Sequence, residues 1–168
     1  MFKISEATEA DFPSIIQIAE ATWWPTYRDI LTHEQIRYML DAIYTPESLA
    51  KQKTDQAQVF LIGKDDGGPQ GFTSYAPRSE NSDVYKLHKL YVLPHNHKRG
   101  YGRMLIDAVR SRMLQANKYL LDVNVNRYNP ALRFYENYGF KIIGEEDVPI
   151  GPYWMNDYVL RIDFSNRS

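Results

Sequence analysis

Glycine and basic residues are concentrated between an apolar stretch and a helical pattern, in the sequence LYVLPHNHKRGYGRML at positions 90–105. Gly100 and Gly102 carry no side chain, so an anion could approach the backbone closely at these positions. A helix that begins here leaves unpaired N–H groups and a partial positive charge in its first turn. Three basic side chains add to this charge: Lys98, Arg99 and Arg103. The segment therefore predicts a cradle for a phosphate or pyrophosphate.

Three kinds of site use a glycine turn of this type, and the chain fits them to different degrees. A P-loop ends in Gly-Lys-Ser/Thr, a sequence that the chain lacks. A dinucleotide fingerprint needs a third glycine, where this chain has Leu105, and an acidic residue about 20 positions later at a strand end. Asp122 has nearly that spacing but falls within a predicted strand. A nucleotide-binding enzyme of this second type stays open as an alternative of weaker fit.

The third kind of site depends on a second block, NPALRFYENYGF at positions 129–140. Together the two blocks resemble the GNAT superfamily of N-acetyltransferases, over about residues 84–145. The family's first signature is an apolar-Tyr-Val strand, a proline, and Gln/Arg-x-x-Gly-x-Gly/Ala at a helix start. Its matches here are Leu90, Tyr91, Val92, Pro94 and HKRGYG at 97–102, in which His97 replaces the usual Gln or Arg. The second signature is matched by Asn129, Leu132, Phe134, Tyr135, Gly139 and Phe140.

The elements that must position these residues follow from hydrophobic periodicity and from turn residues. Strands are predicted at 2–7, 59–63, 71–76, 84–93, 119–125, 140–143 and 153–164. Helices are predicted from Thr8 until Pro25 ends the first, at 32–44, in a short stretch from Pro46, at 101–116 and at 129–138. The inward face of the 101–116 helix is predicted to hold Met104, Leu105, Ala108, Val109 and Met113.

This order predicts one domain, residues 1–168, of the α/β class with a mixed sheet of α+β type. Strands 84–93 and 119–125 flank a helix, so they should be parallel, whereas the flanking hairpins should be antiparallel. The resemblance implies a GNAT-like central twisted mixed sheet with helices on both faces. It also implies that these two strands splay apart at the cofactor site.

The resemblance implies acetyl-CoA as co-substrate and assigns its contacts. The loop amides would hold the pyrophosphate, in a cradle formed by His97, Lys98, Arg99, Gly100, Tyr101, Gly102 and Arg103. The pantetheine arm would pair with the strand backbone, as an added strand would, at Leu90, Tyr91 and Val92. Asn129 matches the family's polar contact to the cofactor.

The resemblance also implies that Tyr135 is the proton donor to the departing thiolate. A tyrosine has a pKa near 10 and a thiol one near 8.5, so a neutral tyrosine is available at pH 7. His88 lies on the strand beside the expected thioester, where relatives often carry Glu, and it could take the amine proton or simply face solvent. His95 and His97 have no third ligand nearby in the sequence, so no metal site is expected.

For the acceptor amine, the resemblance implies a site between the N-terminal helices and the last strands, with Trp24, Tyr27, Trp154 and Asp157 as candidates. Aromatic rings and a carboxylate suit a cation, although the rings could equally be ordinary core. Residues 21–49 and the ending IGPYWMNDYVL are similar to bacterial spermine/spermidine acetyltransferases of the superfamily. The acceptor would be a polyamine or another small amine.

Composition limits the remaining possibilities. The chain has no cysteine, so no acyl-cysteine intermediate can form and the amine should attack the thioester directly. A net charge of −1 argues against a nucleic-acid binder. No signal peptide pattern and no run of about 18 apolar residues is present, which predicts a cytoplasmic protein without a membrane partner. A homodimer through the C-terminal strands is plausible. A non-catalytic acyl-CoA-binding module and a protein or peptide N-acetyltransferase stay open as alternatives.

Overall fold

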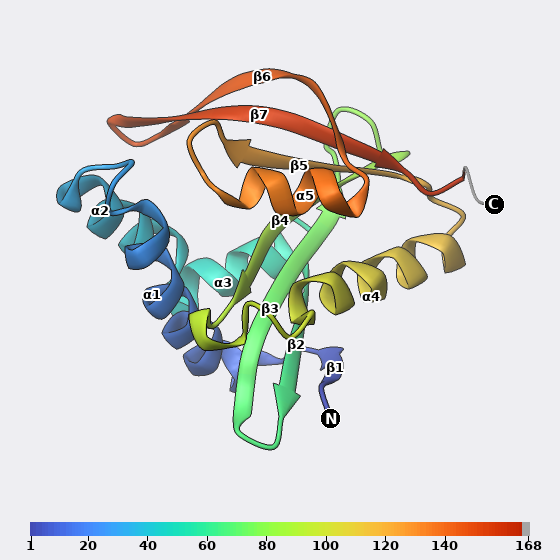
Figure 1. The fold of residues 1–168 in the computed structure, drawn as a ribbon, viewed down its shortest axis with the longest axis horizontal. Coiled ribbons are helices and arrows are strands. Elements are labelled where there is room, and N and C mark those ends of the chain that lie inside the picture. The colour runs from blue at the N-terminus through green and yellow to red at the C-terminus, as the bar shows by residue number, and fades with distance from the viewer. Residues whose placement is uncertain (166–168) are drawn as a thin grey trace.

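The structure, a computed structural model, describes residues 1–165, so the last three residues of the predicted 1–168 domain lie outside the described residues. Within this part, one sheet has the strand order β1-β2-β3-β4-β5-β7-β6 (Figure 1). The strands are β1 Lys3–Glu6, β2 Val59–Asp65, β3 Gly68–Pro77, β4 Val84–Val92, β5 Leu120–Asn126, β6 Lys141–Ile150 and β7 Tyr153–Asp163. The α-helices are α1 Phe12–Tyr27, α2 His33–Ile43, α3 Pro46–Thr54, α4 Tyr101–Gln115 and α5 Ala131–Tyr138.

The pairing of the strands confirms the predicted mixed sheet. β4 and β5 are parallel and are connected through α4, whereas the other neighbouring strands pair antiparallel. Parallel neighbours need a crossover connection, and the periodic apolar residues of 101–115 supply it as a helix. The mixed sheet with helices on both faces was thus predictable from the order of the elements.

Helices cover both faces of the sheet, and each face has its own hydrophobic core (Figure 1). Helices α1, α2 and α3 pack on one face, where Phe60 and Ile62 of β2 point. Helices α4 and α5 pack on the other face, where Leu61 points. Because both faces are covered, β2 points apolar side chains to both sides in Phe60, Leu61 and Ile62.

Three local predictions were wrong, each because tertiary packing outweighed a local signal. Pro25 does not end α1, which continues to Tyr27; proline removes one helical hydrogen bond but leaves the next one, from Arg28 N to Trp24 O at 3.0 Å. Met104 does not face the core, since it is 39% exposed and the fully buried Ile106 takes its place. The strand predicted at 140–143 extends to Ile150 because it pairs with β7 along its whole length.

The buried carboxylate of Asp122 joins β3, β5 and β7. It accepts hydrogen bonds from Arg78 Nε at 2.9 Å and from Arg161 Nε and Nη2 at 2.7 and 3.1 Å. The side chain of Asp122 is 1% exposed. Asp122 is therefore a structural ion-pair residue at the closed end of the β4–β5 pair, and the dinucleotide alternative loses its acidic residue.

We expect Asp122→Ala to lower the free energy of unfolding by about 3–5 kcal/mol, because it leaves two guanidinium groups without their buried partner. Urea denaturation monitored by circular dichroism measures this change. The matched control is Asp83→Ala, which removes an exposed partner of Lys118. An effect of Asp122→Ala no larger than that of this control would contradict the structural role.

Candidate active site

A pocket opens where β4 and β5 separate. The two strands pair from Val84 with Leu120 to Leu87 with Val123, and no further pairing follows. Pairing with β3 skips His88, since Ser74 lies opposite Lys89 and Tyr75 opposite Leu87. This extra residue is a β-bulge, and bulges bend the strand that contains them. The bend at His88 therefore takes β4 away from β5.

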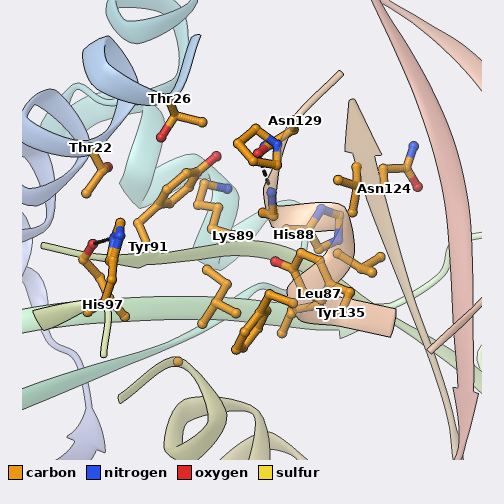
Figure 2. A pocket seen from close by; sticks show the side chains of 18 of the residues that line it. Thr22, Thr26, Leu87, His88, Lys89, Tyr91, His97, Asn124, Asn129 and Tyr135 are labelled. Atoms are coloured by element: carbon orange, nitrogen blue, oxygen red, sulfur yellow. Dashed lines mark hydrogen bonds between the residues drawn. The ribbon is translucent and has the colours of Figure 1, made fainter. Parts of the chain in front are cut away.

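This β4–β5 pocket has a volume of about 410 Å³. Its wall is formed by β4, β5, α1, α5 and the loop that leads into α4 (Figure 2). Of the predicted cofactor residues, the lining includes Leu90, Tyr91, Val92, His97, Gly100, Gly102 and Asn129. A long, thin ligand with an anionic end fits this shape, because one end of the pocket is a helix N-terminus.

The N-terminus of α4 has the form of an anion cradle. Gly100 adopts a left-handed conformation at φ +78°, and no side chain caps the helix. Within residues 1–165, the backbone N–H groups from Gly100 to Arg103 donate no hydrogen bond. Four unpaired donors at a helix N-terminus attract phosphate oxygens strongly. A pyrophosphate therefore suits this end of the pocket.

The side chains of the cradle do not all turn toward the pocket. Tyr101 donates a hydrogen bond from its hydroxyl to Asp65 at 2.8 Å and stacks on Phe2 at a centroid distance of 3.8 Å. The Arg103 guanidinium lies over the Tyr138 ring at 5.0 Å. Arg99 is exposed, 3.9 Å from Asp65. Tyr101 thus offers its backbone to the cradle, and the exposed cations of the loop, Lys98 among them, add a positive field at its rim.

Two polar residues of the pocket also hold its loops in place. His97 Nε2 donates to Val92 O at 2.8 Å, which ties the cradle loop back to the end of β4 (Figure 2). The Asn129 carboxamide oxygen accepts from Ala131 N at 2.9 Å at the start of α5. Its amide nitrogen is 3.5 Å from the Tyr27 hydroxyl, on α1. Asn129 therefore joins α5 to α1 across the pocket.

Tyr135 reaches the pocket from α5 and lies near Leu87 of β4 (Figure 2). The residue is 7% exposed and packs edge-on against Phe134 and Phe140. Its hydroxyl makes no hydrogen bond within residues 1–165, although it borders the pocket. Burial raises the pKa of Tyr135, so the hydroxyl keeps its proton across the physiological range. The arrangement leaves a neutral O–H donor for a ligand.

His88 lies at the mouth of the pocket, on the β-bulge. Its side chain reaches solvent, but protein atoms crowd much of the ring. Burial and then the neighbouring cations Lys89 and Lys86 lower the pKa of His88 to about 3. The imidazole is therefore uncharged at pH 7, where it can accept a hydrogen bond but is a weak base.

The four predicted acceptor residues do not share one place. Tyr27 is buried and lines the pocket. Asp157 is buried and does not line the pocket itself. It accepts a 3.3 Å hydrogen bond from Asn124, which does line the pocket. Trp24 packs against His33 at a centroid distance of 4.6 Å, and Trp154 is 57% exposed on β7; neither lines the pocket.

Several lining residues were not predicted. Thr22 and Thr26 of α1 face the pocket from above β4 (Figure 2). Lys89 and Asn124 line it from β4 and β5. The sequence does contain a signal for the last two, since each is a polar residue between apolar neighbours inside a strand. A buried polar group within a strand usually has a partner or a ligand.

Comparison with known proteins agrees with this geometry. Residues 56–142 match the acetyltransferase (GNAT) domain. An uncharacterized N-acetyltransferase of Mycobacterium tuberculosis is 30% identical over 154 residues, which cover 91% of this chain and 96% of the relative. An uncharacterized N-acetyltransferase of Bacillus subtilis, YuaI, is 26% identical over 89% of this chain and 86% of its own.

The crystal structure of PaiA N-acetyltransferase from Thermoplasma acidophilum, in complex with coenzyme A, has the same fold. Its TM-score is 0.82 at 22% identity, covering 98% of this chain and 99% of that one. The chain belongs to the GNAT family of N-acetyltransferases, which transfer the acetyl group of acetyl-CoA to an amine. In the described residues, no helix is long and apolar enough to cross a membrane.

Proposed function

We propose that the chain transfers an acetyl group from acetyl-CoA to a small primary amine, by direct attack of the amine on the thioester. The observation that carries this proposal is the β4–β5 pocket, with unpaired amides at one end and the free Tyr135 hydroxyl inside it. The cradle from Gly100 to Arg103 would hold the pyrophosphate. The backbone of Leu90 and Tyr91 would pair with the pantetheine arm. The Val92 carbonyl would not take part, because it already accepts a hydrogen bond from His97.

One side chain then donates a proton, and a second positions a water molecule that removes one. Tyr135 would give its proton to the departing sulfur, because its hydroxyl is neutral and has no competing partner. The amine must lose a proton, since only about one alkylamine molecule in a few thousand is neutral at pH 7. His88 is too weak a base to take that proton efficiently, so we infer that it accepts a hydrogen bond from a water molecule that passes the amine proton to bulk solvent.

An acidic cluster beside the pocket supports an amine that carries a second cation, such as a polyamine. Asn124 donates to Glu146 at 2.7 Å and to Asp157 at 3.3 Å. The oxygens Asn124 Oδ1 and Asp157 Oδ1 are buried and have no hydrogen-bond partner within residues 1–165. Burial raises the pKa of Asp157, so its carboxylate forms at a somewhat higher pH than usual. An ammonium group that reached either oxygen would supply the hydrogen-bond donor that it lacks.

The first test measures thiol release from acetyl-CoA with a thiol-reactive dye, across polyamines, amino acids, lysine peptides and peptides with free N-termini. The chain has no cysteine, so it contributes no background signal. We expect release with polyamines, and an Asp157→Asn variant should raise the KM for them roughly tenfold, the effect of losing about 1.4 kcal/mol of binding. The KM for acetyl-CoA should stay unchanged.

Other outcomes select the alternatives. Release with peptides alone would identify a protein or peptide acetyltransferase. Thermal stabilisation by acetyl-CoA without release from any amine would favour a non-catalytic acyl-CoA-binding module. An unchanged polyamine KM in Asp157→Asn would remove the acidic cluster from the acceptor site.

A further inference from the structure

Lys89, on β4, is a buried lysine without a carboxylate partner. It is 7% exposed, and its Nζ donates a hydrogen bond to Gln58 Oε1 at 2.9 Å. The amine lies 5.4 Å from the centre of the Phe60 ring. Gln58 Oε1 also accepts from Ser74 Oγ at 2.9 Å, which fixes the direction of that amide. Among the described residues, Lys89 forms no ion pair.

A buried ammonium with a single acceptor is costly, and the environment of Lys89 favours the neutral amine. Burial and then the charge of Lys86 lower the pKa of Lys89 to about 7. About half of the molecules therefore carry a neutral Lys89 amine at pH 7, against about one in a few thousand for an ordinary lysine. A neutral amine has a free lone pair and is a nucleophile.

Lys89 borders two cavities. One is the β4–β5 pocket, which it shares with Tyr135. The other, called here the α3 cavity, has a volume of about 350 Å³ and lies between β4 and the α2–α3 region. The titratable side chains that line the two cavities besides Lys89 are Tyr27, Tyr44, Lys51, His88, Tyr91, His97 and Tyr135. None of them is a carboxylate, so no negatively charged side chain lining these cavities stabilises a charged Lys89.

The α3 cavity contains polar atoms without partners. Trp23 Nε1 and Gln52 Oε1 are buried and make no hydrogen bond within residues 1–165, and both residues line the cavity. The orientation of the Gln52 amide is fixed, because its Nε2 donates to Ile43 O at 2.9 Å and to Ser48 Oγ at 3.0 Å. The Trp23 indole N–H lies beside the Tyr44 hydroxyl, and it can donate to another acceptor atom that enters this cavity.

We propose that Lys89 is an acetylation site of the enzyme itself, acetylated from acetyl-CoA bound in the β4–β5 pocket when no external amine is present. The proposal rests on the proposed function, since it uses the same donor and pocket. The Nζ lone pair attacks the thioester carbonyl carbon, a C–N bond forms and the C–S bond breaks. The proton lost by Nζ passes to the sulfur, directly or through the Tyr135 hydroxyl, and coenzyme A leaves as the thiol.

The product suits the surroundings of Lys89. The amide N–H can keep the hydrogen bond to Gln58, and the new carbonyl oxygen can accept from Trp23 in the α3 cavity. The acetylated side chain is uncharged, so keeping it buried does not require the desolvation of a charge. An amide does not pass its acetyl group on to another amine, so the modified enzyme is an end state and not an intermediate.

The test incubates the whole protein with acetyl-CoA in the absence of amines, then counts acetyl groups by intact mass and locates them by peptide mapping. We expect one acetyl group per chain, on Lys89, formed at least roughly tenfold faster than on the exposed Lys3 and Lys141, because far more of the Lys89 amine is neutral. Gly102→Glu, which blocks the cradle, should abolish modification at Lys89 but leave the slow background at exposed lysines.

Three results would overturn the proposal: no acetyl group on Lys89 while acetyl-CoA raises the melting temperature, modification of Lys89 no faster than of Lys3, or modification that persists in Gly102→Glu. Lys89→Met gives a second measurement, since it should remove the single fast acetylation and keep the background. Acetylation of Lys89 without transfer to any external amine would support this proposal and contradict the proposed function. Transfer to amines without modification of Lys89 would do the reverse.

Discussion

Replacing Gly102 with glutamate is expected to abolish acetyl-CoA binding while the chain still folds. The substitution places a carboxylate in the first turn of α4, beside the N–H groups that the pyrophosphate would occupy. Like charges brought together in a binding site cost several kcal/mol, so the affinity should fall roughly a hundredfold or more. Isothermal titration calorimetry with acetyl-CoA measures the change.

The fold should survive Gly102→Glu because a Cβ atom there has almost enough room. It would lie 3.2 Å from Phe134 Cζ, a contact that a small movement of the ring relieves. The matched control is Gly144→Glu on β6, where no heavy atom lies within 4 Å of the new Cβ. Both variants should have native circular dichroism, and only the Gly102 variant should lose the cofactor. Normal affinity in Gly102→Glu would place the pyrophosphate elsewhere.

Tyr135→Phe is expected to lower turnover by roughly ten- to a thousandfold, the range that a general acid supplies. The substitution removes the neutral hydroxyl but keeps the ring that packs on Phe134 and Phe140. Because the pKa of Tyr135 is raised, the wild-type donor should stay protonated well above pH 7, and the loss should be seen throughout that range. Steady-state thiol release measures turnover, and the KM for acetyl-CoA should change little.

Tyr138→Phe is the control for this prediction, since Tyr138 also lies on α5 but its hydroxyl donates to Asp107 and does not line the β4–β5 pocket. It should keep wild-type turnover. Equal turnover in Tyr135→Phe and wild type would remove Tyr135 from the reaction. An equal loss in both variants would instead indicate a general disturbance of α5.

The parts of the fold that depend on local sequence were predictable. The helix predicted at 101–116 is observed at 101–115, and the strand predicted at 84–93 at 84–92. Apolar spacing, Pro94 and the glycines of the cradle are local signals. Each lies within a few residues of the helix or strand end that it predicts. The mixed sheet followed from the order of these elements and the cradle from its glycines and basic residues, whereas the place of Asn129 beside the cofactor was implied by the family resemblance.

Features that depend on contacts distant in sequence were not predictable. Tyr101 was placed in the cradle, and the hydrogen bond of its hydroxyl to Asp65, 36 residues earlier, could not be read from the sequence. Trp154 is of a residue type that is common in binding sites, but its position on β7 leaves its side chain exposed to solvent. The role proposed for Lys89 depends on its contacts with Gln58 and Phe60 and on the two cavities that it lines. The residues next to Lys89 in the sequence give no sign of these contacts.

The bulge at His88 makes the shape of β4 depend on the number of residues in the strand. Leu87 packs in the core beneath α4 and α5, whereas Lys89 lies over Phe60 on the opposite face of the sheet. In a regular strand, residues two apart share a face, so the extra residue exchanges the faces of everything after it. Removing position 88 would make Leu87 and Lys89 direct neighbours, as Tyr75 and Ser74 are on β3, so Leu90 and Val92 would keep their face while β4 lost its bend and came back toward β5. A substitution at this position changes one side chain, but a one-residue deletion would regularise the pairing of β4 with β3 and narrow the pocket.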